Sequence, residues 1–172
     1  MTNKKKITLS IIMLGLLFLL FAVWYKYQYS MDTAKSFEVN TSKLERKLII
    51  ATQGSAFKNE ITKNIVEFYQ PDSIFIKVID ISSLSETDPQ NWTALVIMHT
   101  WENWKPPIDV KAFIDRTQAY HNKIVVLTTS GQGSFKMKGI DAITGESKLE
   151  NTASNTYLIV ERLDPLLKPE QD

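Results

Sequence analysis

Runs of consecutive apolar residues constrain the fold of this chain more than any other feature. They are KLIIAT (residues 47–52), SIFIKVIDI (73–81), ALVIM (94–98), KIVVLTT (123–129) and NTYLIVERL (155–163). A strand that is apolar without alternation is buried on both faces, which is typical of a parallel sheet covered by helices. We therefore interpret all five runs as buried strands.

Helical patterns separate these runs. Residues 60–69 and 108–120 carry apolar side chains at spacings of three and four, the pattern of a helix with one buried face. Strands that alternate with helices predict an α/β fold with right-handed crossovers. We expect a three-layer sandwich with a five-stranded parallel sheet in the strand order 2-1-3-4-5.

The N-terminal segment predicts a membrane-spanning helix. Residues 7–25 contain no charge, and a helix of that length spans roughly the 30 Å core of a bilayer. Trp24, Tyr25, Tyr27 and Tyr29 lie where an interfacial aromatic belt would be expected. We interpret residues 7–25 as a single-pass anchor through which the protein contacts membrane lipid.

A cleaved signal peptide is the alternative to an anchor, since it also begins with lysines and an apolar run. FAVWYKYQYS, which follows the apolar run, offers bulky aromatics and no small-x-small cleavage site. The lysines at positions 4–6 predict that residues 1–6 are cytoplasmic and that the rest of the chain is extracytoplasmic, in the periplasm. Lys26 on the other flank weakens this orientation.

The remaining chain divides into a tether and a domain. Residues 26–45 are polar with little periodicity, which predicts a flexible tether. Residues 46–172 contain all the predicted strands and form the predicted domain. A redox partner or another membrane protein is the kind of partner that this arrangement suggests.

Composition excludes several functions. The net charge is +1 and no basic stripe is interleaved with aromatics, so nothing indicates nucleic-acid binding. The absence of cysteine excludes disulfides, thiolate nucleophiles and iron–sulfur ligation. The two histidines lack the spacing of metal ligands, and no catalytic triad can be proposed, so enzymatic activity stays open.

Candidate site residues follow the predicted strands. In parallel α/β sheets, ligands bind beyond the carboxyl ends of the strands, near the point where the strand order reverses. TQGSAFKN, HTWENWKPP and TSGQGSFKMKG leave those ends. Two tryptophans, Trp101 and Trp104, stand in the second of these loops, where either a packing partner or a flat ligand would be expected.

With these loops, residues 47–163 resemble the flavodoxin-like family. The resemblance implies that FMN is bound and that electrons are transferred. The first loop would hold the FMN phosphate through backbone N–H groups and a helix N-terminus. Its residues here are Thr52, Gln53, Gly54, Ser55 and Ala56.

The second and third loops would flank the flavin ring system. Thr100 and Trp101 match the family's Thr-Trp loop, and Ser130 and Gly131 match the loop that covers the other ring face. The chain departs from the family at Ala56, where another hydroxyl is usual, and at Trp104, where glycine is usual. The final helix is expected to be short or absent.

DAITGES, at residues 141–147, carries a second and weaker resemblance. It is similar to the signature of membrane oxidoreductase subunits in which FMN is esterified to a threonine, although Glu146 and Ser147 differ from that pattern. A turn or helix start is the structural interpretation of the same residues.

Two functions remain open. One is a membrane-anchored flavodoxin-like protein that binds FMN and transfers electrons at the membrane surface. The other is a flavin-free flavodoxin-like accessory or interaction subunit of a membrane complex. The altered first loop favours the second function, and the three loops at one sheet edge favour the first.

Overall fold

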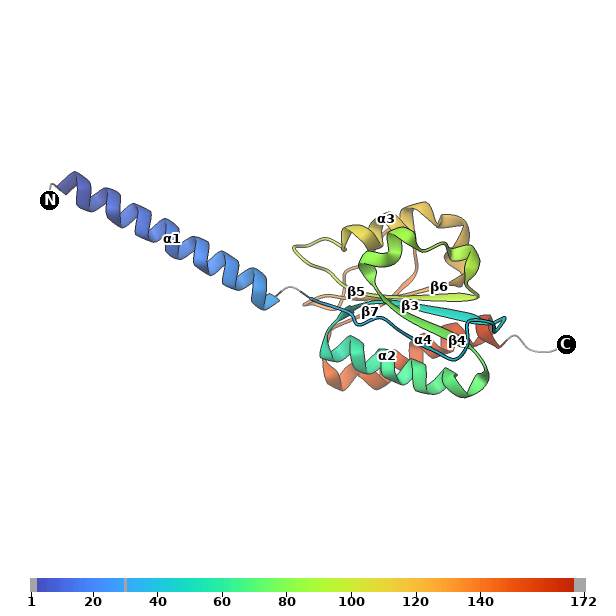
Figure 1. Cartoon of the computed structure of the whole chain (residues 1–172). Coiled ribbons are helices and arrows are strands. Elements are labelled where there is room, and N and C mark those ends of the chain that lie inside the picture. Colours follow the sequence, from blue (N-terminus) through green and yellow to red (C-terminus); the bar gives the residue numbers. More distant parts are fainter. Residues whose placement is uncertain (1–2, 30, 169–172) are drawn as a thin grey trace. The chain divides into compact units, whose positions relative to one another are not determined.

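The computed structural model describes residues 3–29 and 31–168 (Figure 1). Residues 1–2, 30 and 169–172 lie outside it, as do the side chains of Tyr27 and Tyr29 in the predicted aromatic belt. The chain forms two units, residues 1–30 and 31–172. The first contains helix α1 (Asn3–Tyr29). Within it Lys4–Tyr25 is long and apolar enough to cross a membrane, a property that a signal sequence shares.

The second unit contains a seven-stranded sheet (Figure 1). Its five parallel strands are β3 (Lys47–Gly54), β4 (Phe75–Asp80), β5 (Ala94–Thr100), β6 (Ile124–Thr129) and β7 (Ala142–Gly145). Their order across the sheet is β4-β3-β5-β6-β7, which confirms the predicted 2-1-3-4 order of the first four predicted strands, and β7 takes the fifth position.

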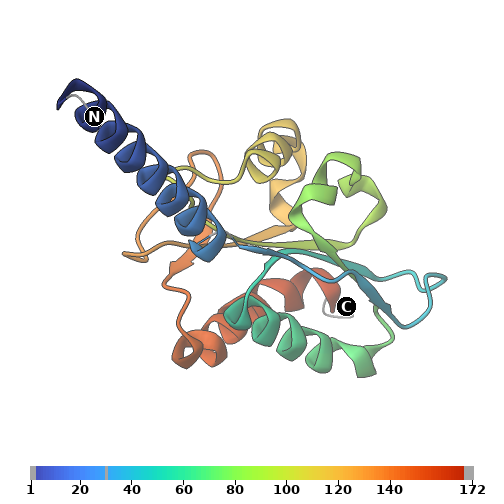
Figure 2. The ribbon, with the colours of Figure 1, turned by 60° about the vertical axis from the view of Figure 1, so that its left-hand side comes forward.

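Helices cover both faces of this sheet (Figure 2). The helices α2 (Ala56–Tyr69) and α4 (Thr152–Leu167) share one face, and α3 (Ile108–Arg116) lies on the other. Neighbouring residues of β3 serve different faces: Ile50 packs in the cluster beneath α2 and α4, and Ile49 in the cluster beneath α3. Burial on both faces explains the continuous apolar runs.

Five short 3-10 helices complete the described part of this unit. Gln70–Asp72 follows α2 and Ile81–Glu86 follows β4. Pro89–Asn91 precedes β5, Gln118–Lys123 follows α3, and Leu149–Asn151 precedes α4.

The predicted fifth strand was wrong. Residues 155–163 belong to α4, and β7, within the DAITGES segment, takes the fifth position. The buried side chains Ile159, Leu163 and Leu167 recur every four residues, so they form one helical face against the core. A final helix is therefore present, contrary to the expectation that it is short or absent.

The segment predicted as a polar tether is partly folded. Within residues 26–45, β1 (Asp32–Thr33) pairs with β3, and β2 (Phe37–Val39) pairs with β4, both antiparallel. A salt bridge of 2.9 Å joins Lys77 of β4 to Glu38 of β2. These pairings correct the expected flexible tether over this part of the chain.

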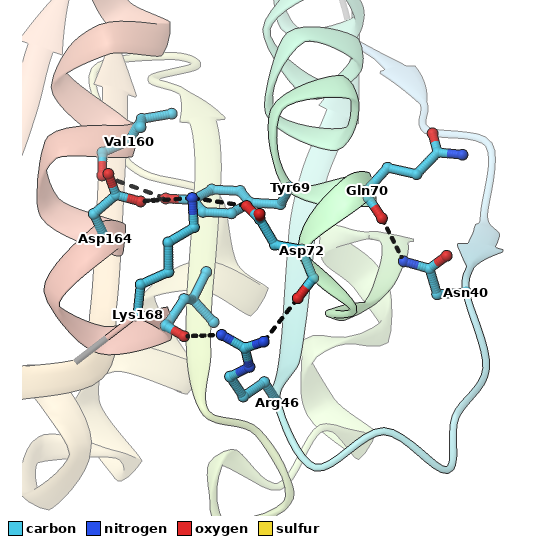
Figure 3. Close-up of polar contacts among 9 residues, drawn as sticks. Asn40, Arg46, Tyr69, Gln70, Asp72, Val160, Asp164 and Lys168 are labelled. Carbon is cyan, nitrogen blue, oxygen red and sulfur yellow. Dashed lines mark hydrogen bonds and ion pairs between the residues drawn. The ribbon is translucent and has the colours of Figure 1, made fainter. Parts of the chain in front are cut away.

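Polar contacts fix α4 at the amino edge of the sheet (Figure 3). Arg46 donates hydrogen bonds to the carbonyl oxygens of Leu167 (3.2 Å) and Asp72 (2.7 Å). The ammonium of Lys168 lies 2.7 Å from the carboxylate of Asp72 and 3.7 Å from that of Asp164. This cluster joins the end of α4 to the start of β3, at the opposite edge from the predicted site.

Candidate functional site

The candidate site is the carboxyl edge of the parallel sheet. The order of strands reverses between β3 and β5, because β3 is followed along the chain by β4 on one side and later by β5 on the other. The segments that follow β3, β5, β6 and β7 all begin at this edge. It is the position at which open α/β sheets bind ligands.

The predicted phosphate loop after β3 is not a loop. Thr52, Gln53 and Gly54 belong to β3 and are buried, and Ala56 is the first residue of α2. Ser55 caps this helix, and its hydroxyl accepts a hydrogen bond of 3.2 Å from the backbone N–H of Lys58. The strand therefore passes into the helix through one residue, which leaves no loop to surround a phosphate.

Strand β1 further restricts this strand end. Asp32 pairs with Gly54, and a Cβ atom added to Gly54 would lie 2.9 Å from the Cβ of Asp32. It would also lie 2.9 Å from the carbonyl oxygens of Asp32 and Thr33. Glycine is thus required here for the close approach of β1, and not for the approach of a ligand.

A chain of hydrogen bonds crosses the carboxyl edge. The ammonium of Lys58 donates to the hydroxyl of Thr100 at 2.7 Å, and this hydroxyl lies 2.8 Å from that of Thr129. The hydroxyl of Ser147, which follows β7, donates to Thr129 at 2.8 Å. Four elements are linked in this way, and Thr100, a predicted site residue, lies in the middle.

The side chain of Gln53 adds a second link. Its carbonyl oxygen accepts from the backbone N–H of Thr100 at 2.7 Å, and its amide donates to the carboxylate of Glu102 at 2.9 Å. The hydroxyl of Thr52 donates to the backbone carbonyl of Gln53 at 3.1 Å. The side chains of Thr52 and Gln53 are therefore engaged within the protein itself.

Lys58 was missed by the sequence analysis. Its side chain is 0% exposed, on the buried face of α2 with Ile61 and Ile65. Burial lowers the pKa of Lys58 to about 8, and the carboxylate of Glu102 offsets this only in part. A lysine in register with the apolar positions of a predicted helix was the signal available in the sequence.

His99 is also buried, at the end of β5. One ring nitrogen, Nε2, lies 3.0 Å from the hydroxyl of Thr128. Burial and the positive charge of Lys58 lower the pKa of His99 to about 4, so the imidazole is neutral at pH 7. A neutral imidazole can donate one hydrogen bond and accept another.

Buried polar atoms without a partner gather at the ends of β5 and β6. Among the described residues, His99 Nδ1, Trp101 Nε1 and Ser130 Oγ make no hydrogen bond. Buried polar groups are rarely unpaired, so this cluster departs from ordinary packing. It is the part of the edge where a ligand with donors and acceptors would satisfy otherwise unpaired groups.

Aromatic side chains fill the space between the loops after β5 and β6. The ring centroids of Trp101 and Phe135 are 5.0 Å apart, and those of Trp104 and Phe135 are 6.0 Å apart. A flat ring held between two such loops needs about 7 Å, because each face requires a contact distance of about 3.5 Å. Phe135, which the sequence analysis missed, occupies this space.

Trp104 is held outward by a tight turn. The backbones of Glu102 and Lys105 exchange two hydrogen bonds, of 2.9 and 3.0 Å. The two residues between them, Asn103 and Trp104, have φ angles of 49° and 64°. Outside glycine, left-handed backbone costs about 1–2 kcal/mol per residue. Trp104 is 79% exposed, so this strained turn carries a large apolar side chain that lies largely in solvent.

The loop after β6 connects to β7. The backbone N–H of Ser130 donates to the carbonyl of Gly145 at 3.1 Å, and Gly131 is exposed. Within the DAITGES segment the structure forms a strand, which corrects the expected turn or helix start. Of the predicted site residues, Thr52, Gln53, Thr100, Trp101 and Ser130 meet at the carboxyl edge.

A pocket of about 800 Å³ lies between α2 and the N-terminal strands. Phe37, Val66 and Val78 give it an apolar wall, and Thr62 contributes a buried hydroxyl that has no partner among the described residues. Its lining includes Thr52, Gly54, Ser55 and Ala56 of the predicted phosphate site, and its remaining lining residues were not predicted.

Comparisons with known proteins show the fold. An archaeal flavodoxin aligns at a TM-score of 0.48 and 13% identity, over 70% of this chain and 98% of its own. The flavodiiron core of a Synechocystis protein aligns at 0.55 and 10%, over 75% of this chain and 38% of its own. A flavo di-iron protein variant from Thermotoga maritima aligns at 0.45 and 12%, over 72% and 37%.

The Synechocystis core, with a TM-score above 0.5, supports a flavodoxin-like α/β fold. This chain spans well under half the length of the two flavodiiron proteins. No protein-family profile matches the sequence, and no curated protein sequence matches it significantly. Identities this low show a shared fold and nothing about ligands.

Proposed function

We propose that this protein is a flavodoxin-like domain tethered to a membrane by α1, and that it serves there as an interaction module without bound FMN. One observation carries the proposal: the carboxyl edge of the sheet is closed by the protein's own side chains. The hydrogen-bonded chain from Lys58 through Thr100 and Thr129 to Ser147 occupies the edge where the fold otherwise binds its ligand.

The phosphate end of FMN is the part that fits least. A phosphate monoester carries a charge of about −1.5 to −2 at pH 7 and needs several N–H donors. Here Ser55 leads directly into α2, and β1 brings Asp32 against Gly54. A carboxylate beside the strand end opposes a phosphate there, since like charges repel.

Membrane attachment rests on α1. Its stretch Lys4–Tyr25 is apolar and long enough to cross a membrane, with a mean hydropathy of 2.6. Such a helix is stable in a bilayer, where its backbone groups are all paired internally. The lysines at positions 4–6 favour a cytoplasmic N-terminus, with the domain on the other side of the membrane.

Attachment can be measured directly. We expect the full chain to remain in the membrane fraction through alkaline carbonate washing and to keep its N-terminal residues. Protease added to spheroplasts should degrade the domain. A shortened soluble product would identify residues 7–25 as a signal sequence, and protection of the domain would reverse the orientation.

FMN binding with electron transfer is the second candidate. It is favoured by the unpaired atoms of His99, Trp101 and Ser130 and by the exposed ring of Trp104. The flavin ring would stack at Trp101 between the loops that begin at Thr100 and Ser130, after Phe135 had moved aside. The flavodoxin-like fold is compatible with this arrangement.

A flavin titration separates the two candidates. The full chain in detergent should be colourless and should leave FMN fluorescence unquenched at high micromolar concentration. Quenching that Trp101→Ala weakens would establish the second candidate instead. Riboflavin, which lacks the phosphate, reports on ring binding alone, so a comparison with FMN and with Ser55→Ala locates the phosphate.

A further inference from the structure

We infer that the tip formed by Trp104 and Ile108 docks into the anionic headgroup layer of the membrane in which α1 is anchored. The proposal rests on the proposed membrane attachment and adds a second, peripheral contact to it. Trp104 is 79% exposed and belongs to the segment between β5 and α3, and Ile108, the first residue of α3, is 85% exposed.

The tip has the composition of a membrane-interface contact. Tryptophan is favoured at headgroup depth because its ring is apolar while its N–H still bonds to water or lipid. The turn at Asn103 and Trp104 holds the indole outward against the backbone's preference. Strain kept at an exposed aromatic indicates a recognition surface and not a packing role.

Lysines occur in both loops that contribute to this part of the surface. Lys105 lies in the same turn, and Lys136 and Lys138 lie in the loop whose Phe135 contacts Trp104. All three are exposed and make no ion pair within residues 3–29 and 31–168. Apolar side chains flanked by lysines complement an anionic lipid surface.

The acidic residues on these loops do not cancel that charge. Glu102 accepts a hydrogen bond from Gln53 and is half-buried. Asp141 forms an ion pair of 3.0 Å with Arg162. Asp109, in the first turn of α3, is the remaining exposed carboxylate in the described part of these two segments.

The first strand of the domain lies at the same edge. Helix α1 ends at Tyr29, and β1 begins at Asp32 and pairs with the carboxyl end of β3. The described part of the domain therefore begins at the edge that carries Trp104. A second contact would fix which edge of the domain meets the lipid.

The chain suits a labelling experiment because it contains no cysteine. Full-length protein with Ile108→Cys is labelled with an environment-sensitive fluorophore and placed, one copy per particle, in nanodiscs. The lipids are phosphatidylcholine with or without phosphatidylglycerol, and a headgroup-depth spin label is the quencher. Ser42→Cys, exposed at the amino edge, is the matched control.

We expect lipid quenching at position 108, strengthened by phosphatidylglycerol, and little at position 42. Trp104→Ser should reduce quenching at 108 to the control level. Changing Lys105, Lys136 and Lys138 to Glu should weaken the docking equilibrium about tenfold or more and remove its dependence on phosphatidylglycerol, since each lysine contributes to attraction by an anionic surface.

Each other outcome overturns a distinct statement. If the protein stays in the nanodisc but both labels are equally unquenched, the docking proposal fails and the anchor stands. If carbonate removes the full chain from membranes, the proposed attachment fails. If the fluorophore at position 108 changes its emission only in nanodiscs that hold two copies of the protein, the tip mediates self-association and does not dock on lipid. Circular dichroism checks that each variant is folded.

Discussion

The side-chain ammonium of Lys58, on α2, lies 2.7 Å from the hydroxyl of Thr100, at the end of β5. This contact spans the point where the strand order reverses, so the first helix of the domain is tied to the strand across the usual ligand position. The lysine also lies 3.5 Å from the sulfur of Met31, just before β1. A buried cation thus connects the N-terminal strand, the helix and the sheet.

Removing this cation should change the pH dependence of stability. Lys58 has a pKa of about 8 in the folded protein and 10.5 as its ordinary value. Between these values the unfolded chain binds more protons, so the free energy of unfolding rises with pH. We expect about 2 kcal/mol between pH 8 and pH 10. Chemical denaturation of Lys58→Met should lack this rise.

The matched control is Lys63→Met, at an exposed position of the same helix. This variant should keep the rise in the free energy of unfolding between pH 8 and pH 10. The measurement stops at pH 10 because burial raises the pKa of Tyr69, so ionisation of that phenol in the unfolded chain lowers stability at higher pH. If the free energy of unfolding rises equally with pH in Lys58→Met and in the unchanged protein, the burial of a charged Lys58 is contradicted.

His99 should make the fold sensitive to acid. Its pKa is about 4 in the folded protein and 6.5 as its ordinary value. As pH falls through this window the unfolded chain gains a proton that the folded one does not, and stability falls by up to about 3 kcal/mol. In His99→Gln the free energy of unfolding should fall less between pH 6.5 and pH 4 than in the unchanged protein. His121→Gln leaves His99 in place, so it should keep the full decrease.

Gly54→Ala should displace β1. The added methyl group would lie 2.9 Å from three atoms of Asp32 and Thr33, closer than van der Waals contact. We expect a loss of about 1–3 kcal/mol in urea denaturation, the usual cost of overpacking, and faster proteolysis within residues 31–35. Gly131→Ala, where a methyl group meets nothing within 4 Å, should change stability by less than about 0.5 kcal/mol.

At position 104 we expect the glycine variant to be more stable than the alanine variant, the reverse of the order in a helix interior. Both substitutions remove the indole, but glycine adopts the φ of 64° without the penalty that alanine incurs. Trp104→Gly should therefore be more stable than Trp104→Ala by about 1 kcal/mol in thermal denaturation. At Lys63, in a helix interior, alanine should be the more stable by about the same amount. The same order at both positions would refute the strained turn.

The sequence alone determined the α/β class, the parallel sheet and the order of four of its strands. Burial on both faces requires apolar residues in unbroken runs, and this requirement is local, so it can be read from residues 47–52 or 94–98 without knowing their partners. The edge on which Thr100 and Trp101 lie follows from the same argument, since parallel strands end together. The presence of an apolar helix near the N-terminus was likewise predicted from composition, although α1 extends beyond residues 7–25 at both ends.

Only the tertiary structure decided which segments complete the sheet. The pairings of β1 and β7 involve two to four residues each and are stabilised by contact with β3 and β6, which the local sequence does not encode. Residues 155–163 are apolar enough for a strand, yet they form α4 because Ile159 and Leu163 complete the core shared with α2.

The state of the candidate site was decided in the same way. Residues 52–56 suggested a phosphate loop, but the side-chain amide of Gln53 bonds to Thr100 and Glu102, which are distant in sequence. Phe135 and Trp101 come together from two loops. Residue types in a sequence indicate which bonds a segment can make. The partners that it finds depend on contacts between distant residues, and these form only when the chain folds.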